Sequence, residues 1–459
     1  MKTKLIYITI FFIYCSIQAQ TTSYIDSTFT QYFRRTKGWI ASDATISVPL
    51  PNGKVIWLFG DTYLDNLSIA DTSVPCLFQV RNSIMVQDNY KRDSFITIID
   101  NSKTGINRTP IKLKDNDTTL FWPGHGFVNG DTAYVFWFRM HHTNYTRYGI
   151  YISKIYWPTF TSKSEISLKQ VNLPNLETEY GDATLVDSTA GYIYIYGQRL
   201  NWIVNEPYIA RCKITSIWQQ WEYYNGNNWQ PNINAAKKIS CFPVAPSFSV
   251  IKQNNKYYII TQENGYLTCG LGQKIFAYVA NSPYGPFNQK KLIYLIRDKY
   301  KGSYLITYNA TAHPEFTKNN ELLISYNVNG ICPSECTNAF NNRMNADTYR
   351  PRLVRVPFTI LDSGIKLPVA AYKVDRYSGN SPLTIQFNAN DSYGESDTLK
   401  YKWIFGDGST DTISKTLHTY TKKGQYKVKL IVYDSGKSDS VLFVINSYTF
   451  KNNFCRYKK

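Results

Sequence analysis

The residues of this chain that could do chemistry recur at the ends of short apolar segments. Asp43 stands near the start of "SDATISVPLPNGKVIWLFGDT", and Asp61 stands near its end. A second acidic copy, "YGDATLVDSTAGYIYIYGQR", places Asp182 where the first copy has Asp43. Carboxyl groups brought to one end of a sheet can act as general acid and base, can bind sugar hydroxyls, or can simply cap turns. The choice depends on the fold that positions them.

Five segments share one plan, in which a polar motif opens a strand, a tight turn follows and an aromatic or aliphatic strand returns. The residues at the equivalent positions are Asp43, His125, Asp182, Ser247 and His313. The intervals between them are 82, 57, 65 and 66 residues, and each accommodates a four-stranded sheet with its loops. Helical periodicity is nearly absent. The repeat therefore predicts an all-β chain with a five-bladed β-propeller over residues 21–362.

In a propeller the innermost strand of each blade lines the axis, and the second strand returns antiparallel beside it. The expected neighbours are Asp43 with Asp61, His125 with Arg139 and His141, Asp182 with Arg199, Ser247 with Glu263, and His313 and Glu315 with Asn327. Five blades would then direct a crown of polar groups at one axial pocket. Trp122 is a candidate for stacking on a sugar ring, although most aromatic side chains should pack between blades.

The chain changes character after residue 362. The motif Trp403-Ile-Phe405-Gly406-Asp407-Gly408, followed by His418-Thr-Tyr420, resembles a PKD (polycystic-kidney-disease) domain, which is an immunoglobulin-like β-sandwich. The resemblance covers residues 368–448 and implies a spacer or a weakly adhesive module without a catalytic role. Trp403 is expected in its core, and residues 449–459 are expected to form a C-terminal tail.

The first region carries a resemblance as well. The segments "WIASDATISVPLPNGKVIWLFGDT", "YNATAHPEFTKNNELLISYNVN" and "ADTYRPRLVRV" resemble an uncharacterised family of exported bacterial domains. These domains are similar to five-bladed glycoside hydrolases, which include arabinanases, xylosidases and endo-D-arabinanases. The resemblance implies that Asp43 is the general base and that Asp182 is a supporting carboxylate.

The proton donor departs from the pattern that this resemblance implies. The donor should be a Glu that opens a later inner strand, but the fourth segment has Pro246-Ser247 there. The remaining candidates for the donor are Glu263, Glu315, Glu179 and Asp61. Three of these have a structural alternative: Asp61 can cap a turn, Glu315 can pair with Arg350 or Arg352, and Glu263 can pair with a basic residue on the rim.

Substrate binding is expected from a second set of residues at the crown. The candidates are Asp61, His125, Arg139, Arg199, His313 and Trp122. The two histidines could equally ligate a central ion or be hydrogen-bonded residues of the channel. No cofactor and no set of metal ligands is assigned, and a central divalent ion remains open. The alternative to a glycoside hydrolase is a carbohydrate-binding propeller or cell-surface adhesin that does not cleave its ligand.

The first 20 residues, MKTKLIYITIFFIYCSIQAQ, have the form of a secretory signal peptide. We therefore expect a secreted or cell-surface monomer that acts on a polysaccharide or oligosaccharide. The net charge of +18 is dispersed along the chain. Such dispersion favours ordinary solvation, with attraction to an acidic polysaccharide as the alternative. Export and the lack of a known motif argue against a nucleic-acid partner, and no later segment has the roughly 18 apolar residues of a membrane span.

Overall fold

The computed structural model describes residues 22–88, 94–201, 204–263, 272–330, 342–365, 367–396 and 398–448. The chain forms two compact units. The first unit comprises the residues up to 296 and residues 306–364, and the second comprises residues 297–305 and the residues from 365 onward. The predicted signal peptide and C-terminal tail lie outside the described residues. No helix in the described ranges is long and apolar enough to cross a membrane.

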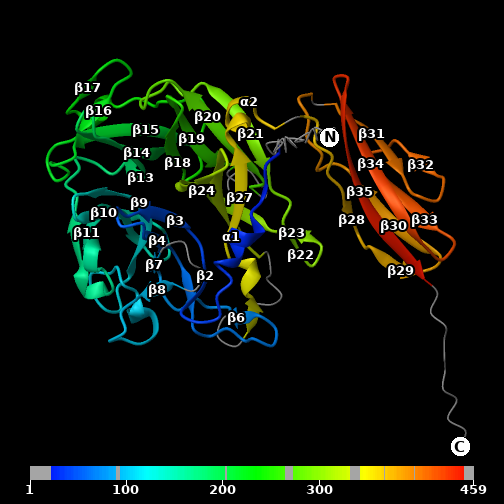
Figure 1. Cartoon of the computed structure of the whole chain (residues 1–459), viewed down its shortest axis with the longest axis horizontal. Coiled ribbons are helices and arrows are strands. Elements are labelled where there is room, and N and C mark those ends of the chain that lie inside the picture. The colour runs from blue at the N-terminus through cyan, green and yellow to red at the C-terminus, as the bar shows by residue number, and fades with distance from the viewer. Residues whose placement is uncertain are drawn as a thin grey trace, which may run out of the picture. The chain divides into compact units, whose positions relative to one another are not determined.

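Five antiparallel sheets make up the first unit (Figure 1). Blade 1 contains β3 (Ile46–Pro49), β4 (Val55–Phe59), β7 (Ser83–Gln87) and β8 (Phe95–Ile98). Blade 2 contains β9 (Thr119–Asn129), β10 (Thr132–His141), β11 (Arg147–Tyr156) and β12 (Ile166–Gln170). Blade 3 contains β13 (Thr178–Asp187), β14 (Tyr192–Asn201), β15 (Val204–Lys213), β16 (Glu222–Tyr224) and β17 (Trp229–Gln230).

The last two blades complete a ring. Blade 4 contains β18 (Ser249–Gln253), β19 (Lys256–Gln262), β20 (Lys274–Ala280) and β21 (Gln289–Leu295). Blade 5 contains β24 (Ile306–Lys318), β25 (Glu321–Asn329), β27 (Arg352–Pro357) and, from the start of the chain, β1 (Tyr24–Ile25). The first strands β3, β9, β13, β18 and β24 contact one another in this order, and β24 also contacts β3. The predicted five-bladed propeller is therefore confirmed.

The N-terminal segment closes the ring by adding β1 to blade 5. The helix α1 (Ser27–Gln31) follows β1 directly, and the Asp26 side chain caps it by accepting the Phe29 N–H at 2.8 Å. The same carboxylate accepts a hydrogen bond from Arg355 Nε of β27 at 2.8 Å. The Tyr24 hydroxyl donates to Glu321 of β25, also at 2.8 Å. Polar side chains thus join both ends of the propeller within one blade.

Apolar residues pack between neighbouring blades, and tight turns connect strands within them. Leu58 of blade 1 and Trp137 of blade 2 belong to one fully buried cluster. Asn254 and Asn255 both have positive φ, of 49° and 62°, and connect β18 to β19. Asparagine tolerates this left-handed conformation, which the two-residue turns of hairpins require. The "NN" turn signals of the sequence therefore match the hairpins of the blades.

Several short elements lie outside the five sheets. In the first unit β2 (Trp39–Ser42) pairs with β5 (Thr62–Leu64), β6 (Ser73–Pro75) pairs with β26 (Arg343–Asn345), and α2 (Phe358–Ser363) follows β27. In the second unit β22 (Lys299–Tyr300) pairs with β23 (Ser303–Tyr304).

The second unit is a β-sandwich. One sheet contains β28 (Lys373–Val374), β30 (Leu383–Asn388) and β33 (Lys415–Tyr420). The other contains β29 (Ser378–Asn380), β35 (Lys437–Tyr448), β34 (Gly424–Asp434), β31 (Lys400–Ile404) and β32 (Thr410–Asp411). Trp403 is completely buried in the core, and its Nε1 donates to the Ile413 carbonyl oxygen at 3.1 Å. The sandwich agrees with the predicted PKD fold.

Candidate active site

A cavity of about 570 Å³ lies where the first strands of the blades begin. All five blades contribute to its wall. The charged and polar lining residues include Asp43, Asp61, Arg147, Glu179, Asp182, Ser247, Glu263, Tyr308 and Tyr349. Five carboxyl groups and one arginine line this axial cavity. Five residues of the crown that the repeat predicts line this cavity, namely Asp43, Asp61, Asp182, Ser247 and Glu263.

Asp43 and Asp61 meet on blade 1, one just before β3 and the other just after β4. Gly60 makes their approach possible, because a β-carbon at that position would collide with Asp43 Oδ1. Tyr349 donates a hydrogen bond to Asp43 Oδ2 at 3.0 Å, and the Tyr308 hydroxyl lies 3.4 Å from the same oxygen. The backbone N–H of Asp61 also bonds to the Asp43 carboxyl group. Three donors therefore stabilise the ionised form of Asp43.

The two carboxyl groups of this pair differ in their ease of ionisation. Burial raises the pKa of Asp43 to about 6, although the hydrogen bonds from Tyr349 and Tyr308 oppose the rise. Burial and the neighbouring charge of Asp43 raise the pKa of Asp61 well above its ordinary value. Arg81 Nε lies 3.0 Å from Asp61 Oδ1 but without hydrogen-bond geometry. Near neutral pH the pair is therefore expected to hold one proton, mainly on Asp61.

Glu179 and Asp182 form a second carboxyl pair on blade 3. Arg147 makes an ion pair with Glu179, and Gln198 Nε2 donates to Glu179 Oε2 at 3.3 Å. Asp182 is 5% exposed, and its Oδ2 has no hydrogen-bond partner among the described residues. Burial, and then the charge of Glu179, raise the pKa of Asp182 well above its ordinary value. Burial therefore favours the protonated form of Asp182, and its unpartnered carboxyl oxygen can form a hydrogen bond with a ligand.

The backbone at the cavity adopts conformations that cost energy. A bulge in β13 contains Gly181, whose φ is 125°, and a β-carbon there would press against the Phe136 ring. The lining residues Ala44, Tyr145 and Asn309 have φ of 53°, 55° and 55°, in the left-handed region that non-glycine residues rarely adopt. Strain of this kind gathers at functional sites, where the surrounding fold holds it in place.

Trp122 lines the cavity together with the exposed ring of Tyr145. Their ring centroids lie 5.4 Å apart, and the planes are 27° from parallel. Trp122 Nε1 is enclosed and finds no partner among the described residues. The two rings could stack on the face of a sugar, and the indole N–H could bind a hydroxyl group.

Glu263 and Ser247 also line the cavity, as the fourth blade was expected to place them. Lys274 Nζ lies 3.3 Å from Glu263 Oε1, which matches the structural alternative for this residue. Ser247 stands where a donor carboxyl group would be expected, so the carboxyl group that blade 4 brings to the cavity is that of Glu263. Glu263 remains a predicted catalytic residue, held by a lysine.

Four predicted binding residues do not line the cavity. His125 bonds through Nδ1 to Thr184 Oγ1 at 2.7 Å, and burial lowers its pKa to about 4. His313 bonds to Ser47 at 2.6 Å and to Ser325 at 2.8 Å, and burial lowers its pKa to about 3. Both are neutral, hydrogen-bonded residues of the channel. Arg139 Nε donates to Thr119, and Arg199 Nε donates to Thr178.

The expected neighbours of these residues were wrong because the motif residues lie at different depths. Asp43 precedes its inner strand, whereas His125, Asp182 and His313 follow the first residues of β9, β13 and β24. Arg199 therefore pairs with Thr178, and His313 pairs with Leu323 rather than lying beside Asn327. The motif residues occupy similar positions in the five repeated sequences, but they lie at different depths along the propeller axis.

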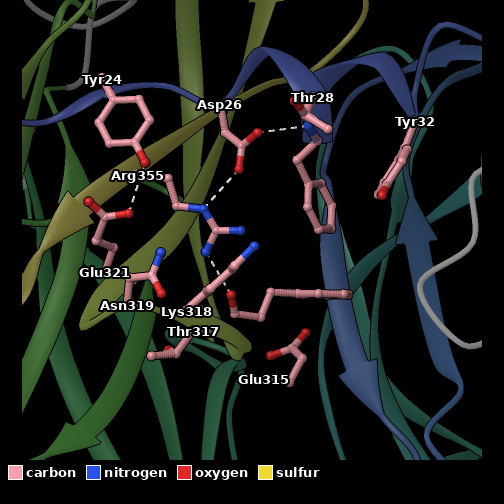
Figure 2. A pocket seen from close by; sticks show the side chains of 12 residues that line it. Tyr24, Asp26, Thr28, Tyr32, Glu315, Thr317, Lys318, Asn319, Glu321 and Arg355 are labelled. Atoms are coloured by element: carbon pink, nitrogen blue, oxygen red, sulfur yellow. Dashed lines mark hydrogen bonds and ion pairs between the residues drawn. The ribbon is translucent and has the colours of Figure 1, made fainter. Parts of the chain in front are cut away.

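Glu315 lines a separate cavity of about 520 Å³ beside α1. Figure 2 shows this cavity with the Asp26–Arg355 and Tyr24–Glu321 contacts and with Glu315 apart from them. Arg350 pairs with Asp347, so the expected partner of Glu315 is engaged elsewhere. Burial raises the pKa of Glu315 to about 7. Its expected place at the crown is therefore corrected, and we do not retain it as a proton donor.

Sequence reasoning missed Tyr308, Tyr349 and Arg147. Tyr308 lies on β24 of blade 5, and Tyr349 lies in the connection between β25 and β27 of the same blade. Both are more than 260 positions from Asp43 in the chain. Tyr349 lies within "ADTYRPRLVRV", one of the segments that carried the family resemblance, and this was the available signal. Among the described residues, no group of three or more His, Cys, Asp or Glu side chains could hold a metal ion.

Residues 26–379 match a family described as a domain of unknown function, DUF5005. Residues 366–444 match the PKD domain family, which confirms the predicted C-terminal domain. Over 65 residues the chain is 40% identical to the collagenase ColA of Bacillus cereus. This match covers 14% of the chain and 7% of the collagenase, so the chain spans a small part of that relative.

Two solved structures are similar to this chain. A protein of Bacteroides ovatus, classed provisionally as a hydrolase, matches with a TM-score of 0.62 and 24% identity, over 75% of this chain and 93% of its own. At this identity the likeness concerns the fold. A GH43_1 enzyme of Xanthomonas citri, complexed with xylose, matches over 72% of this chain and 92% of its own, with a TM-score of 0.38 and 12% identity.

Proposed function

The chain belongs to the DUF5005 family through residues 26–379, and from this premise we propose that its propeller hydrolyses glycosidic bonds of a polysaccharide. The observation that carries the proposal is the meeting of two carboxyl pairs, from blades 1 and 3, in one axial cavity. Glycoside hydrolysis uses one carboxyl group that donates a proton and one carboxylate that activates water or attacks the sugar. The predicted signal peptide supports a secreted enzyme, and the Bacteroides ovatus protein classed as a hydrolase agrees with this reaction class.

Asp43 is the general base of the proposal, and Asp61 is the proton donor. The three donors around Asp43 favour its carboxylate, which can accept a proton from the attacking water. The raised pKa of Asp61 keeps a proton available for the leaving oxygen of the glycosidic bond. After one turnover the proton that Asp43 has accepted must return to Asp61. Their neighbouring positions on blade 1 favour this return.

Blade 3 and the aromatic rings would hold the sugar. Protonated Asp182 can donate a hydrogen bond to a hydroxyl group while Glu179, fixed by Arg147, accepts one from another. Trp122 and Tyr145 can cover the apolar face of the ring. Arg147 is the one basic side chain among the described residues of the cavity wall, and it already pairs with Glu179, so the described lining offers an anionic sugar no available cation. A neutral sugar is therefore the proposed substrate class.

The test separates the two catalytic roles by the quality of the leaving group. Asp61→Asn should lose activity on a natural arabinan or xylan but keep most of it on an aryl glycoside, whose phenolate leaves without protonation. Asp43→Asn should lose activity on both substrates. Asp131→Asn, an exposed change in the turn after β9, is the matched control. If Asp61→Asn lost activity equally on both substrates, Asp61 would not be the proton donor. If Asp43→Asn kept full activity, Asp43 would not be the general base.

A second candidate is a propeller that binds a polysaccharide without cleaving it. The observation that favours it is Ser247 at the position where the family resemblance implies a donor carboxyl group. A glycan that binds in the cavity and is released intact, with wild-type and Asp43→Asn proteins behaving alike, would select this function. The raised pKa of Asp61, beside the more readily ionised Asp43, favours hydrolysis instead.

A further inference from the structure

The larger sheet of the PKD domain presents four lysines on two neighbouring strands. Lys400 and Lys402 lie on β31, and Lys427 and Lys429 lie on β34. In both strands they alternate with side chains that pack in the core of the sandwich, including the fully buried Val428. Because successive residues of a strand point to opposite faces, all four lysines lie on the outer face.

Apolar side chains separate these lysines on the outer face. Lys402 pairs with Ile431 across the β31–β34 ladder, and Lys429 pairs with Ile404 on one side and Leu442 of β35 on the other. Leu442 is 61% exposed. This face therefore carries both positively charged and apolar side chains. We call it the lysine face and define it by Lys400, Lys402, Lys427, Lys429, Ile404, Ile431 and Leu442.

The acidic residues of β34 and β35 have other partners. Asp434 accepts the Glu395 N–H and the Ser396 hydroxyl group, and Asp439 accepts the Ala370 N–H. None of the four lysines makes an ion pair with a described residue. The charge of the lysine face is thus uncompensated within the described part of the domain.

The second sheet of the same domain shows that composition alone does not produce this clustering. On the outer face of β30 and β33 the exposed side chains are Thr384, Gln386, Lys415, Leu417 and Thr419. Only one of these five is a lysine. The two faces belong to one sandwich, so the concentration of lysine on the larger sheet is a property of that sheet.

We propose that the lysine face binds a linear acidic polysaccharide. Such a polymer repeats an anionic group along the chain, and the C–H surfaces of its sugar rings are apolar. The anionic groups complement the four ammonium groups, while Ile404, Ile431 and Leu442 contact the ring faces. A nucleic acid fits less well, because the face has no element that enters a groove and exposes only one aromatic residue, Tyr433, on β31 and β34. The binding does not depend on hydrolysis in the propeller.

The test measures binding of the whole mature chain to a fluorescein-labelled oligogalacturonide by anisotropy at low ionic strength. The double variant Lys402→Glu/Lys429→Glu should bind about tenfold more weakly or worse, and wild-type binding should weaken as salt rises. Lys415→Glu/Lys422→Glu makes the same change of charge away from the lysine face and should stay within about twofold of wild type. Thermal unfolding of each variant checks that the sandwich still folds.

Four results would overturn the proposal. Equal weakening in both double variants would show an unspecific effect of net charge. Unchanged binding in Lys402→Glu/Lys429→Glu, or no binding by the wild type, would exclude the lysine face as the site. Tighter binding of duplex DNA than of the oligogalacturonide would assign the face to a different class of polymer.

Discussion

Replacing Glu315 by glutamine should make the free energy of unfolding less dependent on pH. Burial raises the pKa of Glu315 from 4.5 to about 7. The folded state therefore holds this proton more tightly than the unfolded state, and the resulting stability is fully present below about pH 4.5 and is lost as pH rises to about 7. One pKa unit corresponds to about 1.4 kcal/mol, so the loss is on the order of 3 kcal/mol.

Glu315→Gln has no proton to lose over this range, so its stability should fall less with pH. From pH 4.5 to about pH 8, the free energy of unfolding of the variant should gain about 3 kcal/mol relative to wild type. Urea unfolding followed by tryptophan fluorescence measures this gain, because nine of the ten tryptophans lie before residue 364 and report on the propeller.

Glu177→Gln is the matched control, since it makes the same chemical change on a side chain that is 64% exposed. Its difference from wild type should stay constant with pH to within about 0.5 kcal/mol. If Glu315→Gln showed the same constant difference, the Glu315 carboxyl group would be solvated in the folded protein. Burial would then not raise the pKa of Glu315.

Three further changes test the site and the closure of the ring. Tyr349→Phe removes a hydrogen bond that favours ionised Asp43, so its pKa should rise and the acid limb of the pH–rate profile should move up by about one to two units; an unmoved limb would contradict the role of Asp43. Gly60→Ala should displace Asp43 and lower kcat/KM at least about tenfold with the propeller still folded by tryptophan fluorescence. Arg355→Ala leaves Asp26 without its ion pair and should cost about 3 kcal/mol in urea unfolding, whereas no change would show that the N-terminal strand closes the ring by other contacts.

The sequence was sufficient to predict the ring of blades because each repeat combines a strand pattern with a turn signal. The hairpin from Asp43 to Asp61 closes around Asn52-Gly53 and returns both carboxyl groups to one cavity. The depth of each repeat along the axis was harder to predict, because it depends on where each inner strand begins. His125 and His313 therefore lie in the channel, although their motifs resemble the segment that contains Asp43.

The partners of Asp43 could not be found from local patterns. Tyr308 and Tyr349 reach it only because the fifth blade closes beside the first, and a tyrosine in an aromatic-rich chain carries little signal by itself. Arg147 is similar, since its link to Glu179 joins two blades. Contacts between blades depend on how the blades pack around the ring. The repeated sequence pattern predicts mainly the strands within each blade.

We propose that the axial cavity hydrolyses a neutral polysaccharide with Asp43 as the base. The most direct test is reducing-sugar release by the mature protein from arabinans, arabinogalactans, xylans and uronic-acid polysaccharides, with Asp43→Asn measured beside it. We expect release from a neutral polymer, and we expect this release to disappear in Asp43→Asn. Release that persists in the variant, or a polymer that binds the cavity without any release, would contradict it.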